Sequence, residues 1–141
     1  MDRRTALKVA AIAAISSSLA NAYDTNLIVN TKKVVIKDPS HPSKFELKHL
    51  PDIKLGDKDA KGYTLVEVTV GQEGIIHPST QKHWIYEIEL FADGKKISSV
   101  SLEPEISRGY LSSRVKLDSV KDITAVSKCN LHGIFTASVK V

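Results

Sequence analysis

The sequence predicts an all-β protein, folded as an antiparallel β-sandwich of immunoglobulin type. Short runs of β-branched and aromatic residues, separated by turn residues, recur along residues 23–141. No segment after residue 22 keeps a helical period for three turns, and 141 residues make one domain with room for a core. A β-barrel is the competing architecture, because it would show a similar number and spacing of strands.

The candidate strands follow one another along the chain. The run at residues 63–70 alternates most clearly, with Thr64 and every second residue after it on one face. Asp93-Gly94 is a favourable hairpin turn between two further runs. Because Pro39, Pro42 and Pro51 interrupt residues 39–51, we expect that segment to form no regular structure. The predicted strands are residues 27–29, 34–36, 63–70, 84–91, 96–102, 110–117, 123–127 and 134–141.

Residues 1–22 have the pattern of an export signal. Arg3-Arg4 precedes an alanine-rich apolar run, and Ala20-Asn21-Ala22 offers the small residues that a signal peptidase requires. The run is too short to span a bilayer core of about 30 Å. The pattern resembles a twin-arginine signal, by which bacteria export folded proteins. We expect cleavage after Ala22, a single domain at residues 23–141 and a periplasmic protein that is not integral to the membrane. An uncleaved amphipathic helix or membrane anchor is the alternative.

The charge balance indicates no partner by itself. Residues 1–22 contribute three basic residues against Asp2, so the rest of the chain carries +2 of the formal net charge of +4. A surplus this small and dispersed argues against a nucleic-acid-binding protein.

The single cysteine, Cys129, is informative in an exported protein. It cannot form an internal disulfide, and it excludes a Cys-x-x-Cys redox centre in this chain. In an oxidising compartment a lone thiol should be buried, paired between chains, or bound to something, and binding to a metal is one such possibility.

Several histidines could join Cys129 in a site, and they lie mostly in loops between predicted strands. Taken singly, each is more often a surface or hydrogen-bonded residue than a ligand. The Cys129-x-x-His132 spacing, however, lets one tight turn present both side chains to one ion. His77 and His83 are too far apart for one helical face, but they suit a loop that leaves and re-enters one site. Loops at the end of a rigid sandwich can assemble such a site from distant segments.

Three motifs occur in order and together resemble one family. They are His49-x-Pro51, His77-Pro78-x4-His83 and Cys129-Asn130-x-His132-Gly133. In this order on a small β-protein they resemble the superoxide reductase family, the iron domains of neelaredoxin and desulfoferrodoxin. The resemblance extends from about residue 45 to the end of the chain and includes Lys48 beside the first histidine.

The resemblance implies a superoxide reductase, which reduces superoxide to hydrogen peroxide at one mononuclear non-haem iron without evolving oxygen. The histidines would be equatorial ligands, and Cys129 would be the axial thiolate opposite an open position. Lys48 would attract superoxide and help to guide protons. Separately, the shape of the turn suggests the hypothesis that backbone N–H groups of Leu131 and His132 donate to the sulfur and tune the potential. The implied iron ligands are His49, His77, His83, Cys129 and His132.

The chain departs from the family pattern at one position. Most members have a glutamate two residues before the first ligand histidine, where it caps the oxidised iron, and here that position is Leu47. Glu46 would point to the opposite face in an extended segment, so we expect no carboxylate lid. His41 has no family counterpart and is expected to be a loop histidine.

The resemblance also bears on partners. The chain lacks the cysteine-rich N-terminal domain of desulfoferrodoxin and so resembles the one-iron type, which takes electrons from an external donor. A rubredoxin-like protein or a periplasmic cytochrome would serve, and a homo-oligomer stays open.

Two other classes of function also stay open. The absence of the usual glutamate leaves room for an iron-binding electron-transfer module of the same fold without reductase activity. The third class is a metal-free sandwich that acts as a carrier or adhesion module.

Overall fold

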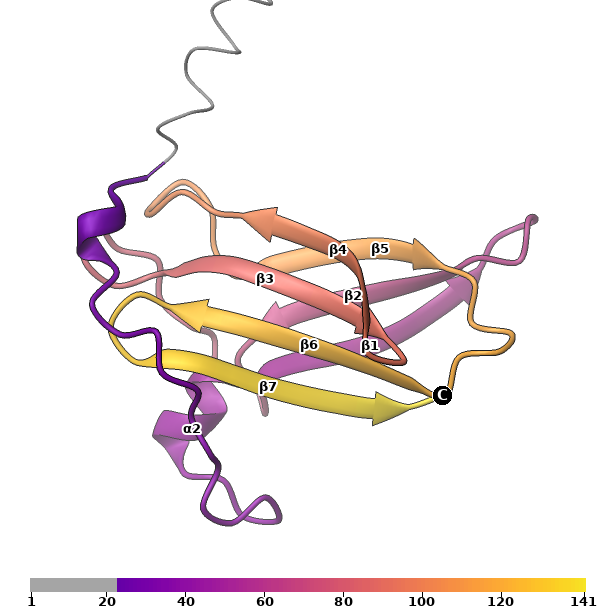
Figure 1. Cartoon of the computed structure of the whole chain (residues 1–141), viewed down its shortest axis with the longest axis horizontal. Coiled ribbons are helices and arrows are strands. Elements are labelled where there is room, and N and C mark those ends of the chain that lie inside the picture. Colours follow the sequence, from indigo (N-terminus) through magenta and orange to yellow (C-terminus); the bar gives the residue numbers. More distant parts are fainter. Residues whose placement is uncertain (1–22) are drawn as a thin grey trace, which may run out of the picture.

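A computed structural model describes residues 23–141, so the predicted export signal at residues 1–22 lies outside the described residues. Seven strands and two short helices make up this part of the chain (Figure 1). The helices are η1 (Thr25–Leu27) and α2 (Lys44–His49). The strands are β1 (Pro51–Lys58), β2 (Thr64–Val70), β3 (Ile85–Ala92), β4 (Lys95–Ser101), β5 (Tyr110–Val115), β6 (Asp122–Cys129) and β7 (Gly133–Lys140).

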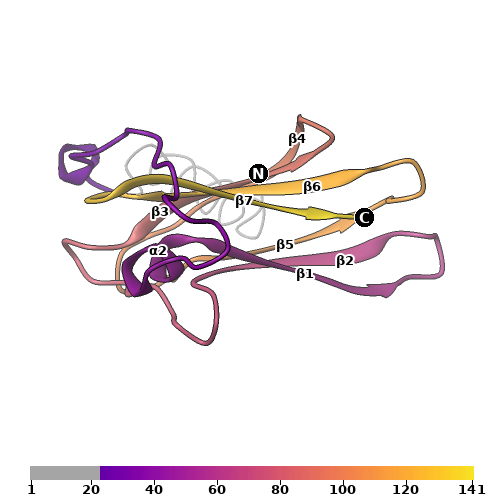
Figure 2. The same ribbon diagram turned by 90° about the horizontal axis from the view of Figure 1, so that it is seen from below.

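The strands form two antiparallel sheets that pack face to face. One sheet has the order β1-β2-β5 and the other the order β4-β3-β6-β7. Figure 2 shows the sheets as two layers, with α2 and several loops gathered at one end. The predicted immunoglobulin-like sandwich is therefore confirmed, and the two sheets do not close into a barrel.

The core lies between the sheets and follows the predicted alternation. Along β2, Thr64, Val66, Val68 and Val70 are buried, while the residues between them are partly exposed. They face the opposite sheet, where Ile88 and other inward residues of β3 and β6 have no exposed surface. Each fully buried side chain of this size contributes about 1.5–3 kcal/mol. The result is a rigid frame for the loops at its ends.

Two predicted strands are wrong. Residues 25–27 form the 3-10 helix η1, in which the Asp24 side chain accepts a hydrogen bond from the N–H of Asn26. Residues 34–36 form no strand, although Lys33 makes an isolated bridge to Ile134. The N–H of Val34 donates to the carbonyl of Ile134 near the start of β7, so this segment contacts the sheet at one point and does not form a full ladder.

The expectation of irregular structure over residues 39–51 is also wrong. Ser43 and Glu46 form a capping box that starts α2, because each side chain accepts a hydrogen bond from the backbone N–H of the other residue. Pro51 begins β1, which is an edge strand of its sheet, so the missing N–H costs no ladder bond. The prolines bound these elements and do not prevent them.

None of the helices within residues 23–141 is long and apolar enough to cross a membrane.

Candidate metal centre

His49 is the last residue of α2, and its position is fixed on two sides. Its Nδ1–H donates to the carbonyl oxygen of Phe45 at 2.7 Å, which leaves the Nε2 lone pair free. The hydroxyl of Ser127, a buried residue of β6, donates to the His49 carbonyl at 2.7 Å. The end of the helix is thereby tied to the sheet beneath it, and the His49 side chain has no exposed surface.

His77 and His83 belong to the loop between β2 and β3. The Nδ1–H of His77 donates to the Pro78 carbonyl at 2.7 Å, so Nε2 is again the free nitrogen. Two backbone hydrogen bonds between Thr80 and His83 close the loop on itself. The Nε2 atoms of His77 and His83 are both buried and have no hydrogen-bond partner. Unpaired buried nitrogens of this kind are rare, and their lone pairs are available to a metal ion.

Cys129 and His132 occupy the turn between β6 and β7. Cys129 is the last residue of β6, is fully buried and has a free thiol. Backbone N–H groups of Leu131 and His132 donate to its Sγ, as the sequence analysis expected. Gly133, with φ of 97°, reverses the chain into β7.

The four imidazole rings lie at the corners of an approximate square. Neighbouring ring centres are 4.6–4.9 Å apart, and neighbouring planes are inclined by 69–82°. One diagonal, between His49 and His83, measures 6.0 Å. Going round the square, the rings belong to His49, His77, His83 and His132.

The nitrogen and sulfur atoms at the centre have the spacing of metal ligands. Two nitrogens each about 2.1 Å from one ion are about 3.0 Å apart at right angles and about 4.2 Å apart on opposite sides. His49 Nε2 and His132 Nδ1 are 3.0 Å apart, and Cys129 Sγ lies 3.6 Å from the same Nδ1. Ligand atoms of His49, His83, Cys129 and His132 all lie within 4.8 Å of one another. His77 falls outside that tight group but contacts two of its rings.

Burial keeps the imidazoles neutral. Burial, assisted by repulsion from neighbouring imidazoles, lowers the pKa of His49 to about 4 and that of His77 to about 3. Burial also lowers the pKa of His83 and His132, and the nearby charge of Lys48 acts in the same direction. At neutral pH all four rings therefore offer lone pairs, which a metal ion requires.

Cys129 experiences opposing effects. Burial raises the pKa of its thiol, while the two backbone N–H groups directed at Sγ lower it. A bound cation would complete the stabilisation of the thiolate, because a coordinating thiol is deprotonated outright.

The square is closed on one side and open on another. His49 and His77 are buried, whereas His83 and His132 are partly exposed. Lys48 is also partly exposed and makes no ion pair within residues 23–141. Its ammonium group is therefore available to an anion that approaches the site.

Two aromatic residues that the sequence analysis missed enclose His49. Phe135 stacks on its ring at 4.7 Å and 18°, and Phe45 packs against the rings of His49 and His132 at 4.6 and 4.9 Å. The alternation of residues 134–141 could have placed Phe135 in the core. The i, i+4 pairing of Phe45 with His49 required the helix that the prolines concealed.

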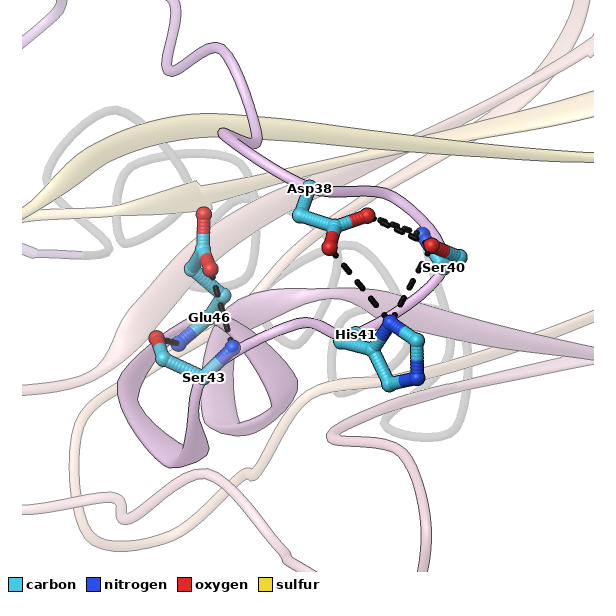
Figure 3. A network of polar contacts seen from close by, with 5 residues as sticks. All are labelled: Asp38, Ser40, His41, Ser43 and Glu46. Atoms are coloured by element: carbon cyan, nitrogen blue, oxygen red, sulfur yellow. Dashed lines mark hydrogen bonds and ion pairs between the residues drawn. The ribbon is translucent and has the colours of Figure 1, made fainter.

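No carboxylate from the segment before His49 reaches the cluster. The Oε1 atom of Glu46 accepts from the N–H of Ser43 at 2.9 Å (Figure 3). Its Oε2 accepts from the N–H of Lys37 at 3.3 Å. Leu47 is buried at 7% exposure. The absence of a carboxylate lid stays a prediction, and the segment is helical and not extended as its reasoning assumed.

His41 lies in an exposed loop and does not belong to the group of candidate ligands, as expected. Its Nδ1 contacts both the Asp38 carboxylate at 3.4 Å and the Ser40 hydroxyl at 3.2 Å (Figure 3). Both partners share one ring nitrogen, so this Asp-Ser-His group does not have the geometry of a catalytic triad, whose members occupy opposite nitrogens.

Comparison with known proteins gives one consistent family. The family model described as Desulfoferrodoxin matches residues 41–138. Desulfoferrodoxin of Nitratidesulfovibrio vulgaris is 41% identical over 93 residues, which are 64% of this chain and 61% of that protein.

Solved structures of similar proteins share the fold. Superoxide reductase (1Fe-SOR) of Giardia intestinalis has 29% identity and a TM-score of 0.58, over 67% of this chain and 98% of that one. Superoxide reductase (neelaredoxin) of Ignicoccus hospitalis has 30% identity and a TM-score of 0.55, over 66% and 79% of the two chains. With its matched residues spanning all five candidate ligands, the chain belongs to the desulfoferrodoxin family.

Proposed function

We propose that this protein is a superoxide reductase with one mononuclear non-haem iron held by His49, His77, His83, His132 and Cys129. The observation that carries the proposal is the convergence of one thiol and four neutral imidazoles, two of which have buried, unpartnered nitrogens. Imidazole and thiolate are ligands that iron accepts, and this donor set leaves one position of an octahedral ion free. Relatives named superoxide reductase support the assignment.

When bound, the iron supplies one electron, so that superoxide and two protons become hydrogen peroxide and no oxygen is formed. The imidazoles add no charge of their own, so the site remains attractive to an anion. Cys129 contributes a thiolate, a ligand that pushes electron density onto iron.

Lys48 has a separate role in the proposal. Its partly exposed ammonium group is close enough to lower the pKa of three of the site's histidines. A cation at this place raises the rate at which an anion reaches the site, through a field that salt weakens. It is also an N–H donor near the position that the substrate would occupy, where it can guide protons.

In this proposal the electrons come from another protein, because the single cysteine, Cys129, is already assigned to the iron. We propose a rubredoxin-like protein or a periplasmic cytochrome as the donor. The twin arginines and Ala20-Asn21-Ala22 support a periplasmic location. Fractionation of cells that express the whole chain tests this: retention in the cytoplasm, with residues 1–22 uncleaved, would contradict it.

Rapid mixing of the reduced iron protein with superoxide tests the function. Oxidation should be fast and should produce the visible sulfur-to-iron charge-transfer band. Cys129→Ser should lack that band, and its persistence would remove Cys129 from the ligand set. Rapid reduction by a redox partner without any response to superoxide would indicate the electron-transfer module.

A further inference from the structure

Residues 23–36, here called the N-terminal strap, lie outside the family match at residues 41–138, yet they run along the turn that carries Cys129 and His132 (Figure 1). The N–H of Val29 donates to the carbonyl of Asn130 at 2.9 Å. Two more backbone bonds of 2.9 Å join Lys32 and Val34 to Ile134 on the far side of the turn. The strap therefore holds the turn on both sides of His132.

Asn130 connects the strap to the rest of the site. Its side chain is fully buried, and Nδ2 donates to the carbonyls of Leu27 in the strap at 3.0 Å and of Lys82 at 2.8 Å. Its Oδ1 accepts from the N–H of Trp84 at 2.9 Å. Lys82 and Trp84 are the two neighbours of His83. One amide thus sets the position of the Cys129 turn relative to His83.

Gly133 allows the strap to approach the turn closely. A Cβ at this position would lie 2.4 Å from the carbonyl oxygen of Lys32 and 3.2 Å from the Asn30 side chain. At the other end of the strap, Tyr23 packs against the rings of Trp84 and Tyr86 at 5.9 and 6.0 Å. The strap is therefore anchored both beside the β3 segment and against the β6–β7 turn.

We propose that the strap and Asn130 act as a clamp that positions Cys129 and His132 for the metal. The inference rests on the proposed metal centre, since a clamp matters only if these side chains hold an ion. Asn130 and the strap are positioning elements, because they contact the backbone of the ligands' segments and not the ion. Partners that orient metal ligands typically change metal affinity 10- to 100-fold when they are lost.

Val29→Pro tests the clamp at an exposed position. Val29 is 68% exposed, and proline removes the N–H that bonds to Asn130 and also fixes φ at about −65°. Val35→Pro is the matched control, because Val35 is 85% exposed in the same strap and its N–H has no hydrogen bond within residues 23–141. Cobalt(II) is the probe, since its sulfur-to-metal absorption band reports the bond to Cys129. The rate of cobalt transfer to EDTA measures how firmly the site holds it.

Val29→Pro should release cobalt about tenfold faster than the wild type and shift the sulfur-to-cobalt band, while Val35→Pro should match the wild type. Equal release from all three proteins would overturn the clamp. Faster release with an unmoved band would also overturn it, because a merely structural loss of stability would not place the sulfur differently. A wild-type protein that binds cobalt without a sulfur band would instead contradict the proposed metal centre.

Discussion

Acid should destabilise the metal-free protein, because His49 and His77 are buried as neutral imidazoles. Their pKa values fall from 6.5 to about 4 and about 3 in the folded protein, mainly through burial. The unfolded chain therefore binds more protons below pH 6.5, and stability falls with pH from 6.5 towards these folded values. At pH 5 each of these histidines lowers the free energy of unfolding by about 2 kcal/mol, at about 1.4 kcal/mol per pH unit below 6.5. The pair should cost about 4 kcal/mol, a large part of a typical domain's stability.

Urea denaturation of the metal-free protein at pH 7 and pH 5 measures this loss. The carboxylates with lowered pKa values contribute little in this window, since their unshifted values are 3.8 or 4.5. His77→Gln should reduce the pH 7 to pH 5 difference by about 2 kcal/mol. His41→Gln is the control, because that side chain is 86% exposed, and it should leave the difference unchanged. Two results would refute this reasoning: a loss of unfolding free energy between pH 7 and pH 5 below about 1 kcal/mol in the wild type, or an unreduced loss in His77→Gln.

Two further perturbations separate local effects from general ones. Lys48→Gln should slow the reaction with superoxide about tenfold and remove most of the salt dependence of its rate, which stopped-flow mixing at several ionic strengths would measure. Lys44→Gln, on the same helix, is the control and should leave the rate and its salt dependence unchanged. Equal effects of the two substitutions would contradict the role of Lys48. Gly133→Ala should lower the free energy of unfolding by more than about 2 kcal/mol, because it combines a positive φ with the close approach to the Lys32 carbonyl. Gly62 has a similar φ of 87°, but a Cβ there would meet nothing within 4 Å, so Gly62→Ala should lower the free energy of unfolding by only about 1 kcal/mol. An equal loss of stability at both glycines would contradict this account.

The sandwich could be predicted because its strands follow simple rules. Residues 64–70 alternate between the core and the surface along their whole length, as the sequence indicates. The hairpin at Asp93-Gly94 is found where its turn residues predict it, and both residues have positive φ. In these segments local preference and tertiary packing agree.

The segments that could not be predicted depend on partners far away in the chain. Residues 27–36 have strand-forming side chains, but their hydrogen bonds go to a turn about 100 residues later, which no local pattern reveals. Helix α2 is only six residues long, too short for a periodic signal, and its capping box is the only local sign of it.

The candidate ligands could be named from their motifs, yet their surroundings could not. Spacing indicated that Cys129 and His132 share a turn, and the structure brings both to His49. Motif spacing did not show that Ser127 and Phe135 would contact His49, because those contacts depend on how the two sheets pack. Oligomeric state and the electron donor remain predictions.

The stoichiometry of the reaction tests the central claim most directly. The anaerobically reduced iron protein is mixed with superoxide, and hydrogen peroxide and oxygen are both measured. A superoxide reductase should form one hydrogen peroxide for each superoxide consumed and no oxygen, because each superoxide takes its electron from the protein. One oxygen for every two superoxide ions would mean dismutation and would contradict the proposed function.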